Sequence, residues 1–372
     1  MTSVKSALQR RLAAFLSDPI EGVADEAVVV APSTLDEAAA VLSVASEHSL
    51  PVLVWGGGTH QGMGGRVDPA IVLSTARLDS IVDWQPEDLT VVVEAGVRVA
   101  DLEDLLAGRS QTAVLPEVPG DGTVGGAVAA GISGFRRLRY GPTRDRMLEV
   151  EVVTGDGRLV RGGGRVVKNV TGYDLPRLAT GSFGSLGLIG RVCLKLWPLP
   201  AAARTVTLPE ARPDYGYRPL AVVEEPDRVL VFLAGTPAEV EARTAELGGG
   251  HEEGLRWPGA PAGSIRLSLR VAPRLLPDAL EQIPASWSYQ ALPGVGEARI
   301  GAADFDPVSF GEVRRWAESH GGALVLIEAP GHVHESFDPW GTPPAGMDLQ
   351  RRVVARFDPD RIVNPGRLPG GL

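Results

Sequence analysis

Clustered glycines between residues 116 and 190 constrain this chain more than any other feature. Three groups lie in this stretch: GDGTVGGAVAAG, GGG and GSFGSLG. Glycine weakens helices and strands, so its repeated use indicates backbone that passes close to a bulky group or presents free N–H groups to an anion. A loop-rich surface would use the same residues. A further glycine cluster upstream favours a binding site.

The composition is that of a globular protein with a sizeable core. Hydrophobic residues make up 44% and charged residues 22% of the 372 residues. The formal net charge of -10 argues against a nucleic-acid-binding protein, which needs cations for the phosphates. Cys193 is the one cysteine and reads as a small buried side chain. An iron–sulfur cluster needs about four thiolates, so such a carrier would belong to another chain.

We expect the N-terminal segment to be neither a signal peptide nor a membrane span, because it has no long apolar stretch and carries internal charge. Leu8, Leu12, Phe15 and Leu16 fall at helical spacing. This predicts a short amphipathic helix packed on the body, with contact to a membrane surface as the alternative. With no disulfide possible, we expect a cytoplasmic protein.

The N-terminal half alternates strands with helices, which predicts an α+β or α/β arrangement. Thr34 and Glu37 have the spacing of a capping box, and Asp156-Gly157 indicates a hairpin turn. The expected strands are 27–30, 51–55, 71–73, 81–84, 89–94, 148–153, 158–160 and 186–197, and the expected helices are 34–48, 100–106 and one from about 123.

The C-terminal half begins with a run of prolines after residue 201, which indicates a domain boundary. We therefore divide the chain into domains 1–201 and 202–372. The second has the pattern of a smaller α+β domain whose tail is a helix followed by a turn. Its expected strands are 229–234, 265–271 and 323–327, its expected helices are 237–247 and 310–320, and residues 248–254 are expected to form a loop.

The expected strand that ends at Trp55 runs directly into the loop GGGTHQGMGG. This loop lacks both the Walker A lysine and the G-x-G-x-x-G fingerprint. Successive N–H groups in such a turn can still form a nest for a pyrophosphate. His60 is interpreted as a loop residue and not as a general base.

The two later glycine clusters add candidate contacts. PGDGTVGG would place a helix start beside the same phosphates, with the Thr123 hydroxyl close by. The stretch KNVTGYDLPRLATGSFGSLGLI carries polar side chains suited to a polar ring system, namely Lys168, Asn169, Tyr173 and Asp174.

Taken together, the motifs carry a family resemblance. The resemblance rests on five motifs in order: a strand followed by GGGT, then PGDGTVGGAVA, RYGP, VKNVTGYDL followed by GSFGSLG, and a late NPGR. Through these motifs the chain closely resembles the FAD-linked oxidases of the p-cresol methylhydroxylase/vanillyl-alcohol oxidase type. Within that family the chain is most similar to the smaller, FAD-binding subunit of bacterial glycolate oxidase. The resemblance covers residues 24–200 and 350–368.

The resemblance implies an FAD-binding domain of two α+β subdomains, a smaller α+β cap domain, and a C-terminal segment that returns to the FAD site. It implies an FAD-dependent oxidoreductase that oxidises a small 2-hydroxy acid as a subunit of a glycolate-oxidase-like complex. The implied partners are a sister flavoprotein and an iron–sulfur subunit, with attachment to the inner membrane through them. The alternatives are a non-catalytic FAD-binding or scaffold subunit and a stand-alone FAD-dependent alcohol oxidase or dehydrogenase.

Residue by residue, the resemblance implies an FAD site with a pyrophosphate loop, a wall along the diphosphate and flavin, the RYG turn, and an adenine contact. The FAD is expected to be non-covalent, since His60 does not align with the histidine that some relatives use for covalent attachment. The implied residues are Gly56, Gly57, Gly58, Thr59, His60 and Gly62 in the loop; Pro119, Gly120, Thr123, Gly125, Gly126, Gly131, Ser133 and Gly134 in the wall; Tyr140 and Gly141 in the turn; and Ile189 at the adenine.

The second half departs from the catalytic relatives, whose larger cap binds a metal and the substrate through histidines and a carboxylate. Only GHVHE offers such ligands, and we interpret it as a solvated turn, so no metal site is predicted and the roles of His332 and His334 stay open. No catalytic residue stands out. Tyr173, Lys168 and His334 are the candidate general bases.

A dense basic patch comprises Arg136, Arg137, Arg139, Arg144 and Arg146. Three uses compete for it. The arginines could steer a carboxylate substrate to the flavin, meet an acidic partner subunit, or serve as ordinary surface charge.

Overall fold

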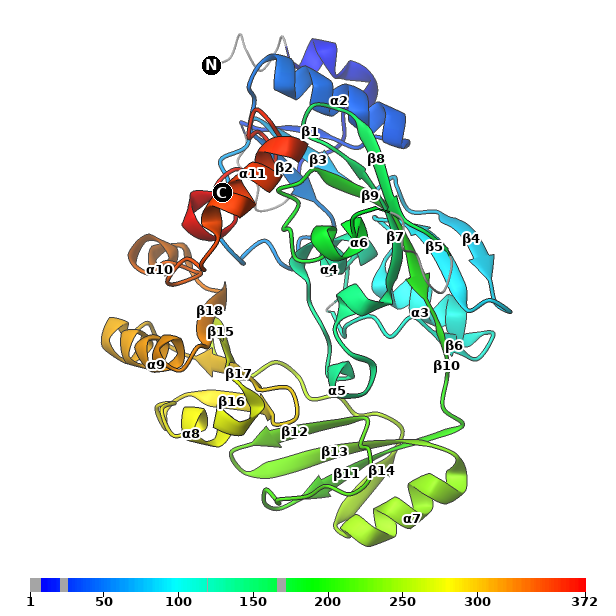
Figure 1. Cartoon of the computed structure of the whole chain (residues 1–372), viewed down its shortest axis with the longest axis vertical. Coiled ribbons are helices and arrows are strands. Elements are labelled where there is room, and N and C mark those ends of the chain that lie inside the picture. Colours follow the sequence, from blue (N-terminus) through cyan, green and yellow to red (C-terminus); the bar gives the residue numbers. More distant parts are fainter. Residues whose placement is uncertain (1–7, 21–25, 119, 166–171) are drawn as a thin grey trace.

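The computed structural model describes residues 8–20, 26–118, 120–165 and 172–372. Two sheet-containing parts make up most of the molecule, one above the other in Figure 1. The upper part contains the first 200 residues and the C-terminal tail. The lower part is built on one large sheet that begins at Ala202, so we propose residues 201 and 202 as the boundary between the two domains.

The first unit of the upper part is a three-stranded parallel sheet of order β1-β3-β2, covered by helix α2. The Thr34 hydroxyl accepts from the Glu37 N–H, as the predicted capping box requires, but the Glu37 carboxylate accepts from the N–H and hydroxyl of Ser33. The elements are β1 (Val28–Val30), α2 (Leu35–Glu47), β2 (Val52–Trp55) and β3 (Ile71–Ser74).

The second unit is a five-stranded antiparallel sheet of order β4-β5-β9-β7-β8. Its strands are β4 (Ile81–Gln85), β5 (Thr90–Glu94), β7 (Met147–Val153), β8 (Leu159–Gly163) and β9 (Leu188–Lys195). The associated elements are α3 (Val99–Ala107), α4 (Val124–Ala130), α5 (Arg137–Tyr140), α6 (Leu175–Ala179) and the short pair β6 (Gln111–Thr112) and β10 (Trp197–Pro198).

The lower part is an eight-stranded antiparallel sheet of order β14-β11-β13-β12-β16-β17-β15-β18. Its two halves join at one register pair, Glu224 with Ala291. The strands are β11 (Ala202–Leu208), β12 (Ala221–Glu225), β13 (Arg228–Gly235), β14 (Gly250–Glu253), β15 (Ile265–Arg270), β16 (Ser288–Leu292), β17 (Glu297–Ala302) and β18 (Ala323–Glu328).

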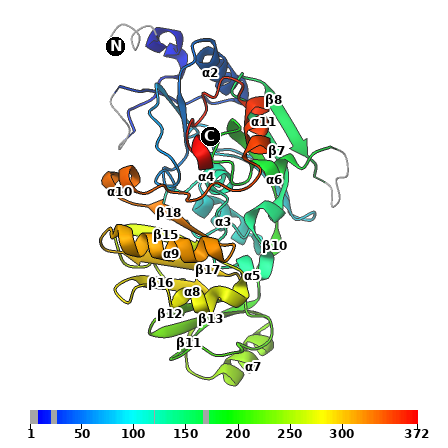
Figure 2. The same cartoon turned by 60° about the vertical axis from the view of Figure 1, so that its left-hand side comes forward.

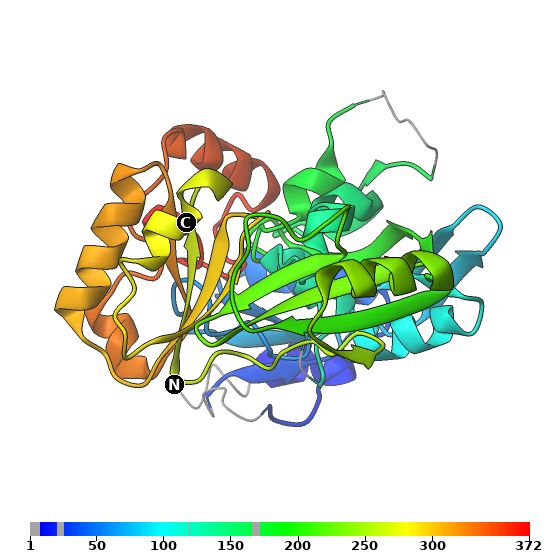
Figure 3. The same ribbon diagram turned by 90° about the horizontal axis from the view of Figure 1, so that it is seen from below.

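Helices cover the face of this sheet that points away from the upper part, as the view from below shows (Figure 3). They are α7 (Pro237–Leu247), α8 (Leu276–Leu280) and α9 (Pro307–Ser319). Alternation along β15 sends Ile265, Leu267 and Leu269 into the core under α8 and α9. The opposite face of the same strand therefore carries Arg266, Ser268 and Arg270 toward the upper part.

Several sequence-based predictions about the second half were wrong. The segment expected as a loop at 248–254 contains β14, an edge strand that pairs with β11. The strands β11, β12, β16 and β17 were not predicted. The GHVHE segment, expected to be a solvated turn, forms α10 (Gly331–Ser336).

The C-terminal tail crosses back to the upper part (Figure 2). Helix α11 (Met347–Phe357) ends next to Asp358, whose carboxylate accepts from the Val363 N–H at 2.8 Å. Val363 then lies beside Val52 as a parallel bridge, so the tail extends the β1-β3-β2 sheet. This pairing brings the NPGR motif next to the loop that follows β2.

Candidate functional site

A first cavity of about 640 Å³ lies where the glycine loop after β2 meets α4, the loop before β9 and the C-terminal tail. Backbone and small side chains form most of its wall. The lining residues are Val54, Gly56, Gly57, Gly58, Thr59, His60, Gln61, Thr75, Ala95, Gly125, Gly126, Ala129, Ala130, Phe183, Gly184, Gly187, Ile189, Asn364 and Arg367.

Close backbone approach explains the glycines of this loop. A Cβ on Gly57 would overlap the backbone oxygen of Asp121, and one on Gly56 would overlap the Thr123 hydroxyl. Thr123 itself caps α4 by accepting from the Gly126 N–H at 3.2 Å. The loop after β2 and the start of α4 are therefore held against each other, and both present backbone to the cavity.

Asn364 joins three segments around this cavity. Its Oδ1 accepts from the Val54 N–H at 2.9 Å, and its Nδ2 donates to the Phe183 carbonyl at 2.6 Å. The residue has a φ of 47°, a left-handed conformation that asparagine tolerates better than most residues. The tail, β2 and the loop before β9 are thus fixed in one arrangement.

Arg367 supplies a buried positive charge to the same cavity. The residue is 6% exposed, and burial lowers its pKa to about 10. Its guanidinium donates to the Gly65 carbonyl at 3.1 Å and to the Gln61 amide oxygen. Among the described residues it has no carboxylate partner, and a buried cation of this kind is stabilised by an anionic or electron-rich group.

A second, larger cavity of about 1570 Å³ adjoins the first, and Ala130 and Phe183 belong to the walls of both. It lies between the upper part, strands β15 and β18, and the tail. Its polar wall consists of Ser133, Arg137, Thr143, Arg144, Thr180, Ser182, Ser185, Arg270 and Gln350. Its large apolar residues are Met63, Leu178, Phe183, Leu186, Val325, Trp340, Leu349, Val353, Val354 and Leu368.

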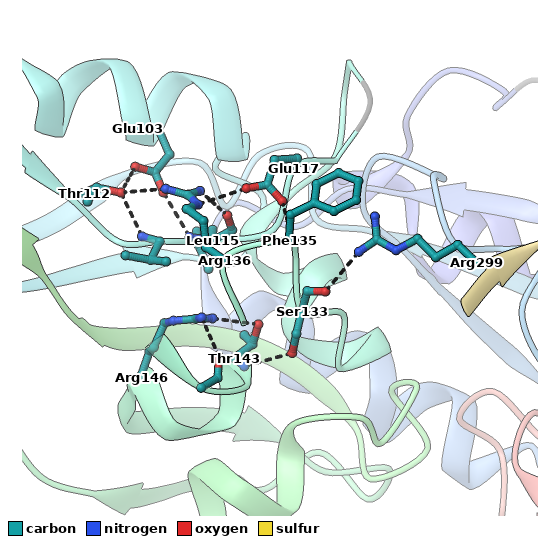
Figure 4. A network of polar contacts seen from close by, with 12 residues as sticks. Glu103, Thr112, Leu115, Glu117, Ser133, Phe135, Arg136, Thr143, Arg146 and Arg299 are labelled. Atoms are coloured by element: carbon teal, nitrogen blue, oxygen red, sulfur yellow. Dashed lines mark hydrogen bonds and ion pairs between the residues drawn. The ribbon is translucent and has the colours of Figure 1, made fainter. Parts of the chain in front are cut away.

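The five arginines of the basic patch have different environments, and Figure 4 shows the contacts of two of them, Arg136 and Arg146. Arg136 is engaged by Glu117 at 2.9 Å and by the Leu115 carbonyl at 2.7 Å. Arg146 is 1% exposed and donates to the Gly141 carbonyl and the Thr143 hydroxyl; burial lowers its pKa to about 10. Arg146 therefore holds the RYG turn, whereas Arg136 ties the start of α5 to the segment that contains Leu115 and Glu117.

Arg137 and Arg144 differ from these two because they line the second cavity. Their ion pairs are long, 3.9 Å from Arg137 to Glu297 and 3.8 Å from Arg144 to Asp145. Arg139 is exposed and does not line this cavity. The structure thus separates the patch into a structural pair, a cavity pair and a surface residue.

His334, on α10, is a half-buried imidazole near two arginines. Among the described residues its buried Nδ1 has no hydrogen-bond partner. Burial, followed by the charges of Arg66 and Arg367, lowers the pKa of His334. The ring is consequently held in the neutral form, which can accept a proton.

The FAD binding domain family matches residues 26–163, a stretch that includes the glycine loop and α4. The GlcE subunit of glycolate oxidase from Escherichia coli is 30% identical to this chain over 77% of the chain and 84% of the subunit. The chain belongs to the FAD-linked oxidoreductases. The resemblance found in its motifs is confirmed, and FAD is the cofactor of the matched domain.

Other relatives of this FAD-linked oxidoreductase are longer. The GlcD subunit of glycolate oxidase from Bacillus subtilis is 36% identical over 48% of this chain and 38% of that subunit. D-lactate dehydrogenase from Archaeoglobus fulgidus is 37% identical over 47% of this chain and 40% of that enzyme. The chain therefore spans about two fifths of the length of these two relatives.

The fold of this FAD-linked oxidoreductase is also shared with a solved structure. An alkyldihydroxyacetonephosphate synthase superposes with a TM-score of 0.63 and 14% sequence identity, over 92% of this chain and 77% of the synthase. The similarity confirms the predicted α+β architecture.

FAD fits the first cavity of this FAD-linked oxidoreductase on two structural grounds. The glycine loop and the start of α4 expose bare backbone to the cavity, and the buried guanidinium of Arg367 lines the same cavity with no carboxylate partner among the described residues. A cofactor with a diphosphate and an electron-rich ring satisfies both features.

Of the residues that the resemblance assigned to FAD, eight line the first cavity: Gly56, Gly57, Gly58, Thr59, His60, Gly125, Gly126 and Ile189. Thr123 packs directly behind them, against Gly56. Gly131 and Ser133 line the second cavity. The remaining described residues line neither cavity. Gly62 packs on β18, Gly134 packs on Glu117, and Gly120 is exposed. Tyr140 packs edge-to-face on Trp197, and the Gly141 carbonyl accepts from Arg146.

Pro119, Lys168 and Asn169 lie outside the described residues. Tyr173 is 91% exposed and lines neither cavity. Asp174 caps α6 through the Arg177 N–H, a local role. The polar contacts expected from Tyr173 and Asp174 are thus not brought to either cavity.

Sequence reasoning missed several lining residues of the first cavity. Asn364 and Arg367 stand in the NPGR motif that carried part of the resemblance, but no site role was assigned to them. Phe183, Gly184 and Gly187 stand in the third glycine cluster, which did signal a site. Val54, Thr75 and Ala95 carry no local signal, because their place depends only on sheet pairing.

Two negative findings apply to the described part of the chain. No helix there is long and apolar enough to cross a membrane. No group of three or more His, Cys, Asp or Glu side chains is arranged there to hold a metal ion.

Proposed function

We propose that this chain is an FAD-dependent oxidoreductase subunit that oxidises a 2-hydroxy acid within a glycolate-oxidase-like complex. The observation that carries the proposal is the similarity to the GlcE subunit over 84% of that subunit's length. The D-lactate dehydrogenase relative acts on another 2-hydroxy acid by its name, which supports the same substrate class.

The first cavity holds FAD in this proposal. Gly56, Gly57 and Gly58 present backbone to the diphosphate, and Ile189 contributes an apolar contact. Arg367 offers its guanidinium to the electron-rich part of the cofactor. We propose that the binding is non-covalent, since His60 does not align with the histidine that some relatives use for covalent attachment. The other residues that the resemblance implied stay predictions for this site; among them, Thr123 packs against Gly56, and Gly131 and Ser133 line the second cavity.

Bound FAD supplies a two-electron oxidant for a substrate that loses a hydride and a hydroxyl proton and becomes a 2-oxo acid. The chain must hold that proton. We retain His334 as the candidate base because its Nδ1 is buried and has no partner among the described residues; like Tyr173, it lines neither cavity. The adjacent Arg66 and Arg367 add positive charge, which attracts a carboxylate to this region.

The proposed partners are a sister flavoprotein and an iron–sulfur subunit. Cys193 is buried, and burial raises the pKa of its thiol to about 11. The chain has no second cysteine, so an iron–sulfur carrier would have to lie on a partner. We propose a cytoplasmic location with attachment to the inner membrane through these partners.

A non-catalytic FAD-binding subunit is the second candidate. One observation favours it: the second cavity, which adjoins the FAD site, is lined by arginines and hydroxyls but by no Asp, Glu or His among the described residues. In that case the chain would bind FAD and leave the oxidation to a sister subunit.

Anaerobic reduction of the FAD-loaded chain separates the two candidates. The purified chain is mixed with D- and L-2-hydroxy acids, and the flavin absorbance near 450 nm is followed with and without the partner subunits. Bleaching by a 2-hydroxy acid, slowed by deuterium at C2, is the expected result. Flavin that stays oxidised in both preparations would contradict an oxidative role for this chain.

A further inference from the structure

The second cavity has a chemical character of its own that no similarity to known proteins assigns. We propose that it binds a 2-hydroxy acid with a long apolar side chain, of about five carbons or more, whose carboxylate is held by Arg137, Arg144 and Arg270. The hydroxy-acid class rests on the proposed function. The choice of an apolar side chain over glycolate rests on the cavity alone.

Charge is the first argument. The three guanidiniums reach the cavity from α5, from the turn before β7 and from β15, and no Asp or Glu belongs to the described wall. The cavity is therefore cationic in a chain whose net charge is -10. A low-dielectric cleft with charges of one sign concentrates ions of the other sign.

The existing partners of these arginines leave capacity for an anion. Arg270 donates to the Ser268 hydroxyl at 3.0 Å and has no ion pair among the described residues. The ion pairs of Arg137 and Arg144 are 3.9 and 3.8 Å long, beyond normal hydrogen-bond distance. In contrast, Arg136, which does not belong to this wall, lies 2.9 Å from the Glu117 carboxylate. A substrate carboxylate would make shorter bonds than the cavity arginines now have.

The apolar wall is the second argument. Leu178 on α6 is 39% exposed, and Leu349 on α11 is 57% exposed, yet both line the same cavity. Trp340, Val353 and Leu368 add further apolar surface from the tail. Glycolate has no side chain and would leave this surface in water. A long alkyl or aryl group would cover it, with a gain of roughly 0.8 kcal/mol per buried methylene.

Size and position agree with this assignment. The 1570 Å³ of the cavity include its open mouth, and about 600 Å³ admit water-sized molecules, whereas glycolate fills only about 100 Å³, roughly the share of three water molecules. The shared wall at Phe183 and Ala130 places the cavity next to the proposed FAD site. A substrate here would lie beside the cofactor, with its side chain extending toward α11.

Four probes test the proposal on the full, FAD-loaded chain. Binding is measured by calorimetry and by the flavin difference spectrum for glycolate, 2-hydroxyoctanoate, octanoate and octane-1,2-diol. We expect both eight-carbon acids to bind at least tenfold more tightly than glycolate, and the uncharged diol to bind at least tenfold more weakly than the acids. Octanoate cannot be oxidised at a hydroxyl, so its affinity reports the site alone.

Variants assign the binding to these residues. Arg144→Gln and Arg270→Gln should each weaken octanoate binding tenfold or more. Leu349→Ala removes apolar surface without adding charge and should weaken octanoate binding more than glycolate binding. Arg139→Gln, at an exposed arginine on the same helix as Arg137, is the control and should bind octanoate as the parent chain does.

The outcomes distinguish this inference from the proposed function. Equal affinity for glycolate and octanoate, or arginine variants that bind octanoate like the parent chain, would overturn the cavity assignment even if glycolate reduces the flavin. The cavity assignment would also be overturned if these arginines bind an acidic partner protein and do not bind octanoate. Arginine-dependent octanoate binding without flavin reduction by any 2-hydroxy acid would support the site and contradict the oxidative role.

Discussion

Phe183 packs edge-to-face on Trp340, with ring centroids 5.1 Å apart and ring planes at 77°. Phe183 belongs to the walls of both cavities, and Trp340 to the wall of the second. The indole Nε1 of Trp340 also donates to the Arg367 carbonyl at 2.9 Å. This aromatic pair therefore links the proposed FAD site, the proposed substrate site and the tail that carries Arg367.

Phe183→Ala should affect both sites at once. Loss of a half-buried ring in an aromatic pair should lower the free energy of unfolding by about 2 kcal/mol. FAD should also bind more weakly, because the two cavities would merge. Chemical denaturation and flavin fluorescence titration measure the two effects. Phe183→Leu keeps most of the apolar volume and should retain most of the FAD affinity; if it behaves like the alanine variant, the wall role is wrong.

Gly57→Ala should damage FAD binding without unfolding the chain. The new Cβ would overlap the Asp121 backbone oxygen, so the loop after β2 and the segment before α4 must separate. We expect FAD affinity to fall at least tenfold, equivalent to about 1.4 kcal/mol.

The matched control for that variant is Gly311→Ala, in the middle of α9 with open space around its Cβ position. It should bind FAD normally and raise the unfolding free energy by about 0.5–1 kcal/mol through helix propensity. Normal FAD affinity in Gly57→Ala would refute the close-approach argument.

His334→Gln should slow flavin reduction by a factor of about 10² to 10⁴ if this imidazole holds the substrate proton. Because burial and the adjacent Arg66 and Arg367 lower the pKa of His334, the ring stays neutral below its ordinary pKa of about 6.5. The parent rate should therefore persist as pH falls through 6.5 and decline only at lower pH. Stopped-flow reduction across pH 4.5–8 tests this, and an unchanged profile in the variant would exclude the role.

Asp358→Asn should preserve or increase stability at neutral pH. Burial raises the pKa of Asp358, so the parent chain loses stability as pH rises through that value. Asparagine keeps an acceptor for the Val363 N–H and carries no charge. The variant should gain about 1 kcal/mol relative to the parent between pH 4 and pH 7.

Asp358→Ala provides the comparison, since it removes the acceptor that places Val363 beside β2. Thermal unfolding of the three proteins at pH 4 and 7 measures the effect. An asparagine variant that is as destabilised as the alanine variant at pH 7 would show that the charge itself is needed.

The glycine clusters predicted from the sequence which segments meet at the first cavity, because their cause is local. A strand that enters GGGT and a helix that begins after GDGT must bring bare backbone together wherever the rest of the chain lies. The similarity to known proteins confirms the predicted family, fold and cofactor. The individual FAD contacts remain predictions, although eight of the assigned residues share one cavity.

Other features depend on contacts between distant parts of the chain. Arg367 donates to Gln61 across about 300 residues, a contact that no local pattern shows. The strand β14 is exposed at all four positions, so it lacks the alternation that marks a half-buried strand. The five arginines look alike in sequence. Only their partners separate Arg136 and Arg146, which hold neighbouring backbone segments, from Arg137 and Arg144, which line a cavity.

The visible absorption spectrum of the purified full-length chain tests the central claim most directly. It is recorded after incubation with FAD and removal of excess cofactor, and again on the supernatant after acid precipitation. Flavin bands that remain with the protein and pass into the supernatant are the predicted result, since we propose that FAD is bound without a covalent bond. A chain that retains no flavin would contradict the account, and flavin that stays in the precipitate would contradict the non-covalent site.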